Sequence, residues 1–134
     1  GVDSLIDWKG FVEDTRALAC RCHAGIFVSQ REEPFSLASI ELMACGRTQI
    51  IPPGGAFPEW LAPAEAARLT QIPERADSVR LSGLSEAGIA LAVEALAADR
   101  DLTATLGRNA LDNWRRHPGE EQFIDTLCKL YAGD

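Results

Sequence analysis

Two kinds of hydrophobic pattern alternate along the first half of the chain. Ala24–Ser29 is a short, continuous apolar run with aromatic and β-branched residues, which predicts a strand that is buried on both faces. Thr48–Pro53 predicts the next strand, and Leu37–Cys45 between them predicts a helix that ends at Gly46. Strand, helix and strand with short links predict a βαβ unit with parallel strands.

The remaining segments extend this alternation over the rest of the chain. Apolar residues that recur every three or four positions predict further helices at Glu13–His23, Ser85–Ala98, Leu102–Arg116 and Glu120–Tyr131. Weaker patterns predict strands at Ser4–Gly10, Ala67–Ile72 and Ser78–Gly83. The fold class is therefore α/β, a three-layer sandwich with a small parallel sheet. A chain of 134 residues is long enough for one such domain and too short for two.

Charge and composition exclude several classes of protein. The chain has 20 acidic and 13 basic residues and a net charge of −7, without a basic stripe, so we expect no nucleic-acid partner. No apolar run approaches the roughly 20 residues of a membrane span, and no signal peptide opens the chain, so we expect a cytoplasmic protein.

The four cysteines lie within apolar helical patterns, and we interpret them as reduced, buried thiols: Cys20, Cys22, Cys45 and Cys128. Cys20 and Cys22, with His23 next to them, have the wrong spacing for a zinc site, and no second pair of cysteines follows. We therefore expect no bound metal.

The chemistry is expected at one edge of the sheet, because ligands of open parallel sheets bind at the carboxyl ends of the strands. The loops Gln30–Phe35 and Pro53–Glu59 follow the two apolar strands and should meet there. Gly54 and Gly55 would let the backbone approach a ligand closely, although a plain turn is the commoner reason for two glycines. The helix that starts near this edge offers N–H groups suited to a phosphate, those of Ser36, Leu37 and Ala38.

Glu41 interrupts a helix that is otherwise apolar. The helical wheel places it between Leu37 and Cys45, away from Ser36 and Ser39. A buried carboxylate without a partner would be costly, so a ligand or a cation is expected beside it. The alternative is that Glu41 lies at the solvent edge of its helix.

The stretch EEPFSLASIELMACG, followed by TQIIPPGGAFPE, resembles the signature of the retaining group 1 glycosyltransferases, which have the two-domain GT-B fold. That family carries two glutamates separated by seven residues, in the pattern E-[GP]-F-G-x(4)-E-A-M-A-[CS]-G, then a strand and G-G-x-x-E. Glu33 and Glu41 fall at the first two glutamate positions, and Glu59 follows Gly55 one residue later than the third glutamate of the pattern. The segment Leu96–His117 is similar to the closing helices of the family.

The resemblance implies that residues 1–134 form a single, partial Rossmann-like domain that corresponds to a truncated C-terminal GT-B domain. Such a domain binds a nucleotide-diphosphate sugar as donor substrate, without a metal or another cofactor, for retaining hexosyl transfer to a glycan, lipid or protein acceptor. By resemblance, Glu33 would be catalytic and hold the donor sugar, and Glu41 would hold the ribose hydroxyls. The remaining donor-binding positions are the amides of Phe35, Ser36 and Leu37, together with Gly54 and Gly55.

The sequence also departs from the family pattern. Ser36 stands where the family has glycine, and could crowd the sugar or cap the helix. The strands that carry the family's basic pair for the diphosphate, and its acceptor domain, have no counterpart here. We therefore expect the C-terminal piece of a longer protein or a remnant, which works with an N-terminal acceptor domain, another chain or as a homodimer. The alternative function is a non-catalytic GT-B-like module for scaffolding or protein contact. A related GT-B sugar epimerase is disfavoured by the spacing of the glutamates.

Overall fold

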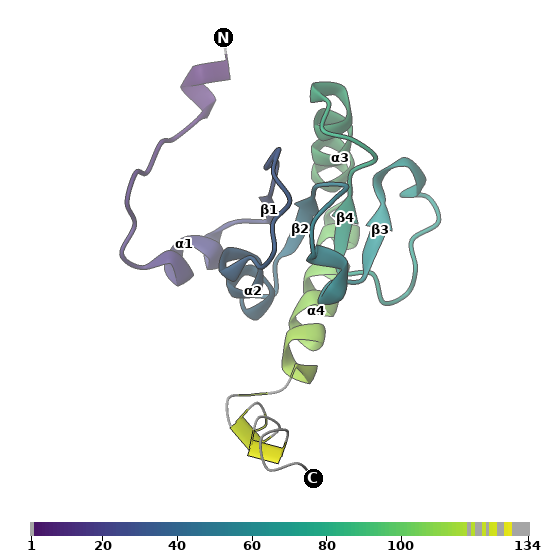
Figure 1. Cartoon of the computed structure of the whole chain (residues 1–134). Helices are drawn as coiled ribbons and strands as arrows, with labels where there is room; N and C mark the ends of the chain where they lie inside the picture. Colours follow the sequence, from purple (N-terminus) through teal and green to yellow (C-terminus); the bar gives the residue numbers. More distant parts are fainter. Residues whose placement is uncertain (1, 118, 120–121, 123, 126–127, 130–134) are drawn as a thin grey trace.

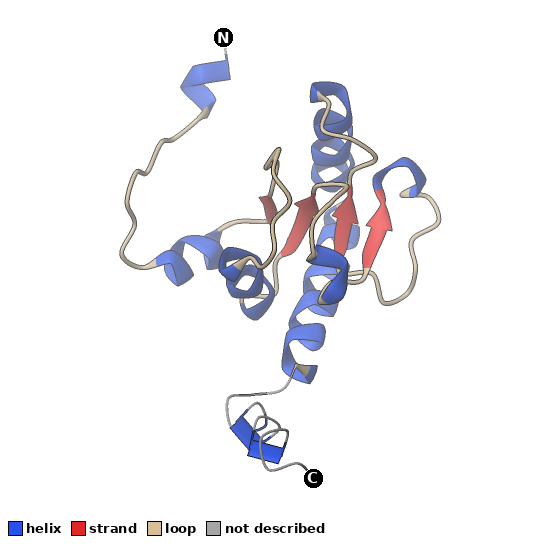
Figure 2. Ribbon diagram, viewed as in Figure 1, coloured by secondary structure: helices blue, strands red, loops and turns tan. Residues whose placement is uncertain are grey.

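The computed structural model describes residues 2–117, 119, 122, 124–125 and 128–129. Its centre is a four-stranded, entirely parallel sheet in the order β1-β2-β4-β3, seen in Figure 2. The strands are β1 (Ala24–Ile26), β2 (Thr48–Ile51), β3 (Pro63–Glu65) and β4 (Ser78–Arg80). The predicted α/β class and the parallel βαβ unit are confirmed.

Four helices and three short 3-10 helices complete the described chain. The helices are α1 (Thr15–Arg21), α2 (Leu37–Ala44), α3 (Glu86–Ala98) and α4 (Arg100–Arg116), and the 3-10 helices are η1 (Val2–Leu5), η2 (Phe57–Glu59) and η3 (Ala66–Arg68). Each α-helix begins after a residue whose side chain accepts a hydrogen bond from a backbone N–H of the first turn: Asp14, Ser36, Ser85 and Asp99. These caps explain why the helices start where they do.

Hydrophobic clusters on both faces of the sheet make the predicted three layers. Ile50 and Ile51, neighbours on β2, point to opposite faces. Ile50 packs with residues of α3, whereas Ile51 packs with Met43 of α2. Helix α4 contributes to both clusters, through Leu106 and Ala110. Figure 1 shows α2 on the near side of the sheet and α3 behind it.

Helix α4 reaches α2 at a contact between two glycines. Gly46 ends α2 with a φ of +65°, a conformation that favours glycine. A Cβ on Gly107 would lie only 2.4 Å from the carbonyl oxygen of Gly46, so a side chain cannot be accommodated there without movement. This close approach sets α4 against the turn between α2 and β2.

The structure corrects two of the predicted strands. Ser4–Gly10 is not a strand, because a 3-10 helix covers Val2–Leu5 and irregular backbone follows. Trp8 and Phe11 in this region are exposed, so its apolar residues do not enter the sheet. Ala67–Ile72 is a 3-10 helix and a turn, and the third strand is Pro63–Glu65 instead. Its initial proline is tolerated because β3 lies at an edge of the sheet.

The prediction that the first apolar strand is buried on both faces is also wrong. In the described part of the chain β1 pairs only with β2, and Ile26 is half exposed. A strand at a sheet edge has one side without a neighbour, which leaves its side chains accessible. The predicted helix Glu120–Tyr131 falls largely outside the described residues.

The cysteines are free thiols but are less buried than predicted. Cys20 and Cys128 are exposed, and Cys22 and Cys45 are half-buried. In the described residues, no group of three histidine, cysteine or acidic side chains is arranged to hold a metal ion. The described helices also include none with the length and apolar character needed to cross a bilayer.

Candidate functional site

The loops after β1 and β2 meet at the carboxyl edge of the sheet, as the sequence predicts. The backbone N–H of Ala56 donates a hydrogen bond to the carbonyl of Glu33 over 3.0 Å. Gly55 has a φ of +87°, and a Cβ there would lie 3.0 Å and 3.1 Å from the backbone N and O of Glu33. Glycine at this position therefore allows the two loops to pack backbone against backbone.

Gly54 has a different environment from its neighbour. A Cβ on Gly54 would make ordinary contacts, at 3.6 Å and 3.7 Å, with the side chain of Glu32. Its φ is not positive. The close approach that the sequence assigns to both glycines is thus required only at Gly55, and there the neighbour is protein backbone.

Aromatic rings support the loop that carries Glu33. Phe35 lies 5.4 Å from Trp60 between ring centroids, and Trp60 lies 5.5 Å from Phe57. Phe57 in turn lies 5.5 Å from Phe27, which follows β1. These tilted pairs join the loop to the core. Phe35 remains 54% exposed, so its outer face is open to solvent.

Buried polar side chains hold α2 over the sheet. Ser36 caps α2, and its Oγ accepts from the Ser39 N–H at 3.3 Å, so the capping role considered for this serine is confirmed. Ser39 also accepts two hydrogen bonds, at its Oγ from Trp60 Nε1 at 3.2 Å and at its carbonyl from Gln49 Nε2 at 2.9 Å. The sequence analysis did not predict that Ser39 and Gln49 are buried and hydrogen-bonded. Their position as polar residues within apolar runs could have indicated it.

The face of α2 that is buried is the opposite of the predicted one. Ser39 and Met43 face the sheet, whereas Leu37 is 69% exposed and Glu41 is exposed. A buried serine is acceptable here because its hydroxyl is hydrogen-bonded. The prediction that Glu41 is buried is therefore wrong, and the alternative position at the solvent side of the helix is correct.

Neither site carboxylate has a polar partner among the described residues. Glu33 is half-buried and Glu41 is exposed. Within the described residues, no ion pair or side-chain hydrogen bond involves either carboxylate. The N–H groups of Leu37 and Ala38 lie in the first turn of α2, where no carbonyl of the helix can accept from them. The edge thus combines accessible acceptors with accessible donors.

Glu41 also lines a cavity of about 430 Å³ between α1, α2 and α4. The other lining residues are Thr15, Arg16, Ala44, Cys45 and Trp114. Glu33 and the glycines lie outside this cavity. The structure therefore places Glu33, Phe35, Ser36 and Gly55 in one cluster, whereas Leu37 and Glu41 lie along the exposed side of α2 and Glu41 lines a cavity with residues of α1 and α4.

Comparison of the structures identifies proteins with the same fold. HepE of Anabaena, solved in complex with UDP and with UDP-glucose, matches 96% of this chain with TM-scores of 0.79 and 0.78 at 20% identity. Sucrose-phosphate synthase of Thermosynechococcus elongatus matches 81% of it with a TM-score of 0.60 at 26% identity. The fold is that of the GT-B glycosyltransferases. No protein-family model and no curated protein matches the sequence itself.

This chain spans about a third of the length of HepE (34%) and a quarter of the length of the synthase (25%). Because the sequence identity is low, the likeness establishes the fold alone. UDP and UDP-glucose are ligands of HepE.

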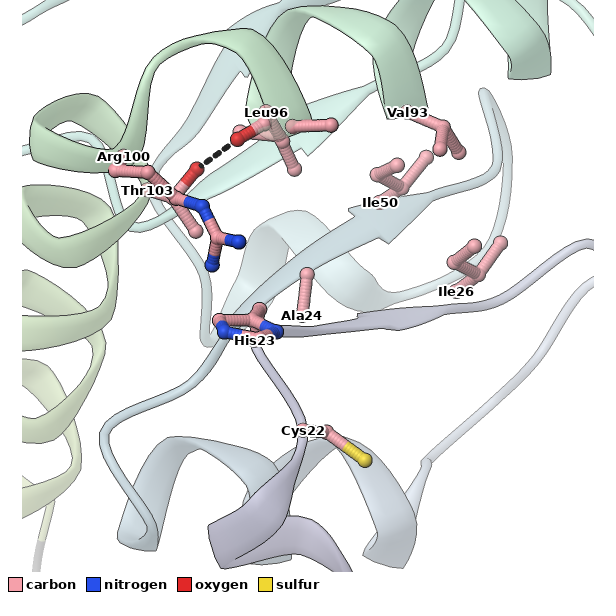
Figure 3. Close-up of a pocket in the computed structure, with 10 residues that line it drawn as sticks. Cys22, His23, Ala24, Ile26, Ile50, Val93, Leu96, Arg100 and Thr103 are labelled. Carbon is pink, nitrogen blue, oxygen red and sulfur yellow. Dashed lines mark hydrogen bonds between the residues drawn. The ribbon is translucent and has the colours of Figure 1, made fainter.

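A second cavity is lined by none of the candidate site residues. It measures about 370 Å³ and runs between β1 and α3. Figure 3 shows Ile26, Ile50, Val93 and Leu96 along it, and the Arg100 guanidinium extending toward His23 at one end. The hydroxyl of Thr103 donates to the carbonyl of Leu96 over 2.6 Å, which joins α3 to α4 at this end. The lining is mostly apolar and follows the unpaired edge of β1.

Asp77 is a fully buried carboxylate that the sequence analysis did not single out. Its Oδ1 accepts from the Ala62 N–H and the Ser78 hydroxyl, both at 2.9 Å, and its Oδ2 accepts from Asn113 Nδ2 at 2.7 Å. Burial raises the pKa of Asp77, and these hydrogen bonds offset part of that rise. The contacts join β4, the start of β3 and α4, which indicates a structural role.

Proposed function

We propose that this chain is the donor-binding part of a retaining glycosyltransferase, which binds a nucleotide-diphosphate sugar for hexosyl transfer to a glycan, lipid or protein acceptor. The observation that carries this proposal is the hydrogen bond from Ala56 to the carbonyl of Glu33. It joins the two loops that contain the glutamate-rich motif and the glycine pair, at the edge where open parallel sheets bind ligands. HepE has the same fold and was solved with UDP and UDP-glucose.

Each site residue has a proposed role. Glu33 positions the donor sugar as the catalytic carboxylate, and Glu41 accepts hydrogen bonds from the ribose hydroxyls. The amides of Phe35, Ser36 and Leu37 face the sugar and diphosphate, with the positive end of the α2 dipole behind them. Gly55 keeps the second loop close to the first, and Gly54 leaves the backbone of that loop open to the donor. Preorganised N–H groups would stabilise charge on the departing diphosphate, and no metal takes part.

The state of Glu41 favours donor binding over a purely scaffolding module. A carboxylate that served only the fold would be expected to pair with a cation or an N–H group. Glu41 has no such partner among the described residues and lies on the exposed side of α2. Glu41 is the fifth of the eight residues of α2, so its carboxylate is accessible to a ligand that lies along the exposed side of the helix.

We further propose that an acceptor domain completes the site, either in the same polypeptide or in another chain, with a homodimer as the second arrangement. Phe35 and Leu37, which follow Glu33 in the chain, have exposed apolar side chains, 54% and 69% accessible. Such side chains are typical of a surface that is covered in the working assembly. The unpaired edge of β1 offers a second surface for contact.

Calorimetric titration of nucleoside diphosphates into the chain tests the proposal. We expect saturable binding of one molecule per chain for UDP or for one of its counterparts, GDP and ADP. Nucleosides without phosphate should bind more weakly, because they cannot use the N–H groups of α2. Absence of binding by all three diphosphates at millimolar concentrations would contradict the proposed function.

A further inference from the structure

Two cysteine thiols from different helices are in contact on the surface of the chain. The thiol of Cys20 donates to Sγ of Cys45 over 3.3 Å, although the two residues are 25 positions apart. Cys20 lies in the last turn of α1, and Cys45 is the C-terminal cap of α2. A disulfide has its sulfurs about 2.05 Å apart, so these two would need to approach by roughly 1.3 Å more.

The surroundings favour that approach. The guanidinium of Arg47 donates from Nη2 to the carbonyl of Cys20, which holds the end of α1 beside the turn after α2. Cys45 is held in turn by its backbone N–H, which donates to the carbonyls of Glu41 and Leu42, both at 3.1 Å. Helix α1 has no fully buried residue, so it can shift toward α2 without opening the core.

The two thiols differ in accessibility. Cys20 is exposed, whereas Cys45 is half-buried. Burial raises the pKa of the Cys45 thiol, the hydrogen bond from Cys20 adds to this, and Arg16 and Arg47 oppose it. An external oxidant would therefore meet Cys20 first, and Cys45 would act as the second thiol.

We propose that Cys20 and Cys45 form a reversible disulfide that joins α1 to the C-terminal end of α2. With glutathione disulfide as the oxidant, the thiolate of Cys20 attacks one of its sulfurs, forms a mixed disulfide and releases one glutathione thiolate. Cys45 then loses its proton and attacks Sγ of Cys20, which forms the intramolecular disulfide and releases the second glutathione. Two protein thiols are oxidised, and one glutathione disulfide is reduced to two thiols.

The disulfide would act on a wall of the cavity that Glu41 lines. Thr15 and Arg16 of α1 form one side of that cavity, and Glu41 and Cys45 of α2 form another. Joining the helices at Cys20 and Cys45 restricts how far these sides can separate. This inference rests on the contact between the helices and holds whether or not the chain binds a nucleotide sugar.

The test uses the whole chain with Cys128→Ser, which removes an exposed thiol outside the contact. The protein is incubated with glutathione disulfide, free thiols are alkylated, and the peptides are mapped by mass spectrometry. We expect a Cys20–Cys45 linkage within one chain, and its reversal by dithiothreitol. The melting temperature should rise by roughly 5–10 °C on oxidation, because the link closes a long loop of the unfolded chain.

Cys22→Ser is the matched control, since Cys22 lies next to the contact but donates from its Sγ to the Leu18 carbonyl. It should keep the linkage and the rise in melting temperature, whereas Cys45→Ser should lose both and accumulate a glutathione adduct on Cys20. A Cys20–Cys22 linkage, linkages only between chains, or mixed disulfides alone in the chain with both thiols would overturn the inference. An oxidised chain with an unchanged or lowered melting temperature would also overturn it, because the folded state would then not accommodate the bond.

Discussion

The backbone N–H of Ala56 donates to the carbonyl of Glu33 over 3.0 Å, and this hydrogen bond joins the loop after β2 to the loop after β1. Gly55 lies against the same peptide, with a φ of +87° and no room for a Cβ. The backbone position of Glu33 therefore depends on a residue that is distant from it in the sequence. This dependence can be measured.

Gly55→Ala should destabilise the chain and displace the loop of Glu33. The new Cβ would meet the backbone N and O of Glu33 at 3.0 Å and 3.1 Å, in a φ region that L-residues rarely adopt. Strain of this kind costs about 1–3 kcal/mol of unfolding free energy, measurable by urea denaturation.

Gly54→Ala is the control for that substitution. Its φ is not positive, and the added methyl would make only ordinary contacts with Glu32. We expect a change below about 0.5 kcal/mol. Equal losses of stability in the two variants would show that the close approach at Gly55 is not the cause.

Glu41→Gln should weaken nucleotide binding without affecting stability. If the carboxylate accepts hydrogen bonds from the ribose hydroxyls, loss of its charge removes contacts worth roughly 1.5–3 kcal/mol. Affinity for the nucleoside diphosphate should then fall about 10-fold to 100-fold by calorimetry. The melting temperature should stay the same, because Glu41 is exposed and has no side-chain partner among the described residues.

Glu94→Gln removes an equivalent exposed charge from α3, on the other face of the sheet, and should leave affinity unchanged. Equal affinities for the wild type and Glu41→Gln would remove Glu41 from the donor site. A lowered melting temperature with unchanged affinity would favour the scaffolding alternative.

Asp77→Asn should change how stability depends on pH. Burial raises the pKa of Asp77 in the folded state above its ordinary value of 3.8, so the folded chain keeps the proton at a higher pH than the unfolded chain does. The contribution of this group to stability is therefore lost as pH rises from about 3.8 through the raised pKa. The Asp77→Asn variant has no carboxyl group at this position, so its stability lacks this dependence on pH.

The difference in unfolding free energy, wild type minus Asp77→Asn, should fall as pH rises through that window and become constant above it. At neutral pH the variant should still be less stable by about 1–3 kcal/mol, because either orientation of the amide faces a donor, from Asn113 or from Ala62 and Ser78. Denaturation at several pH values measures both effects. A difference that grows with pH would mean that the folded pKa is lowered instead.

The chain alone should show no transferase turnover, because catalysis in a two-domain fold needs both domains closed around the substrates. The assay is release of sugar from UDP-glucose, with Glu33→Ala as the control. Release by the wild-type chain that is absent from Glu33→Ala would contradict the need for a second domain.

Most elements from β1 onward, and the meeting of two loops at one edge of the sheet, were predictable from the sequence. Apolar runs and helical spacing are local properties, so β2, α2, α3 and α4 were predicted close to their observed bounds. Parallel strands bring their carboxyl ends to one edge, which was enough to predict that the loops of Glu33 and Gly55 would meet.

The orientation of α2 and the role of each side chain were decided by tertiary contacts. The helical wheel placed Ser39 on the side away from the predicted buried face. Ser39 faces the core instead, because the Trp60 side chain donates a hydrogen bond to its hydroxyl. Glu41 is exposed as a result. The contact between Cys20 and Cys45 is likewise invisible in the sequence, since hydrophobic periodicity places a helix on a sheet but does not say which polar atoms will meet.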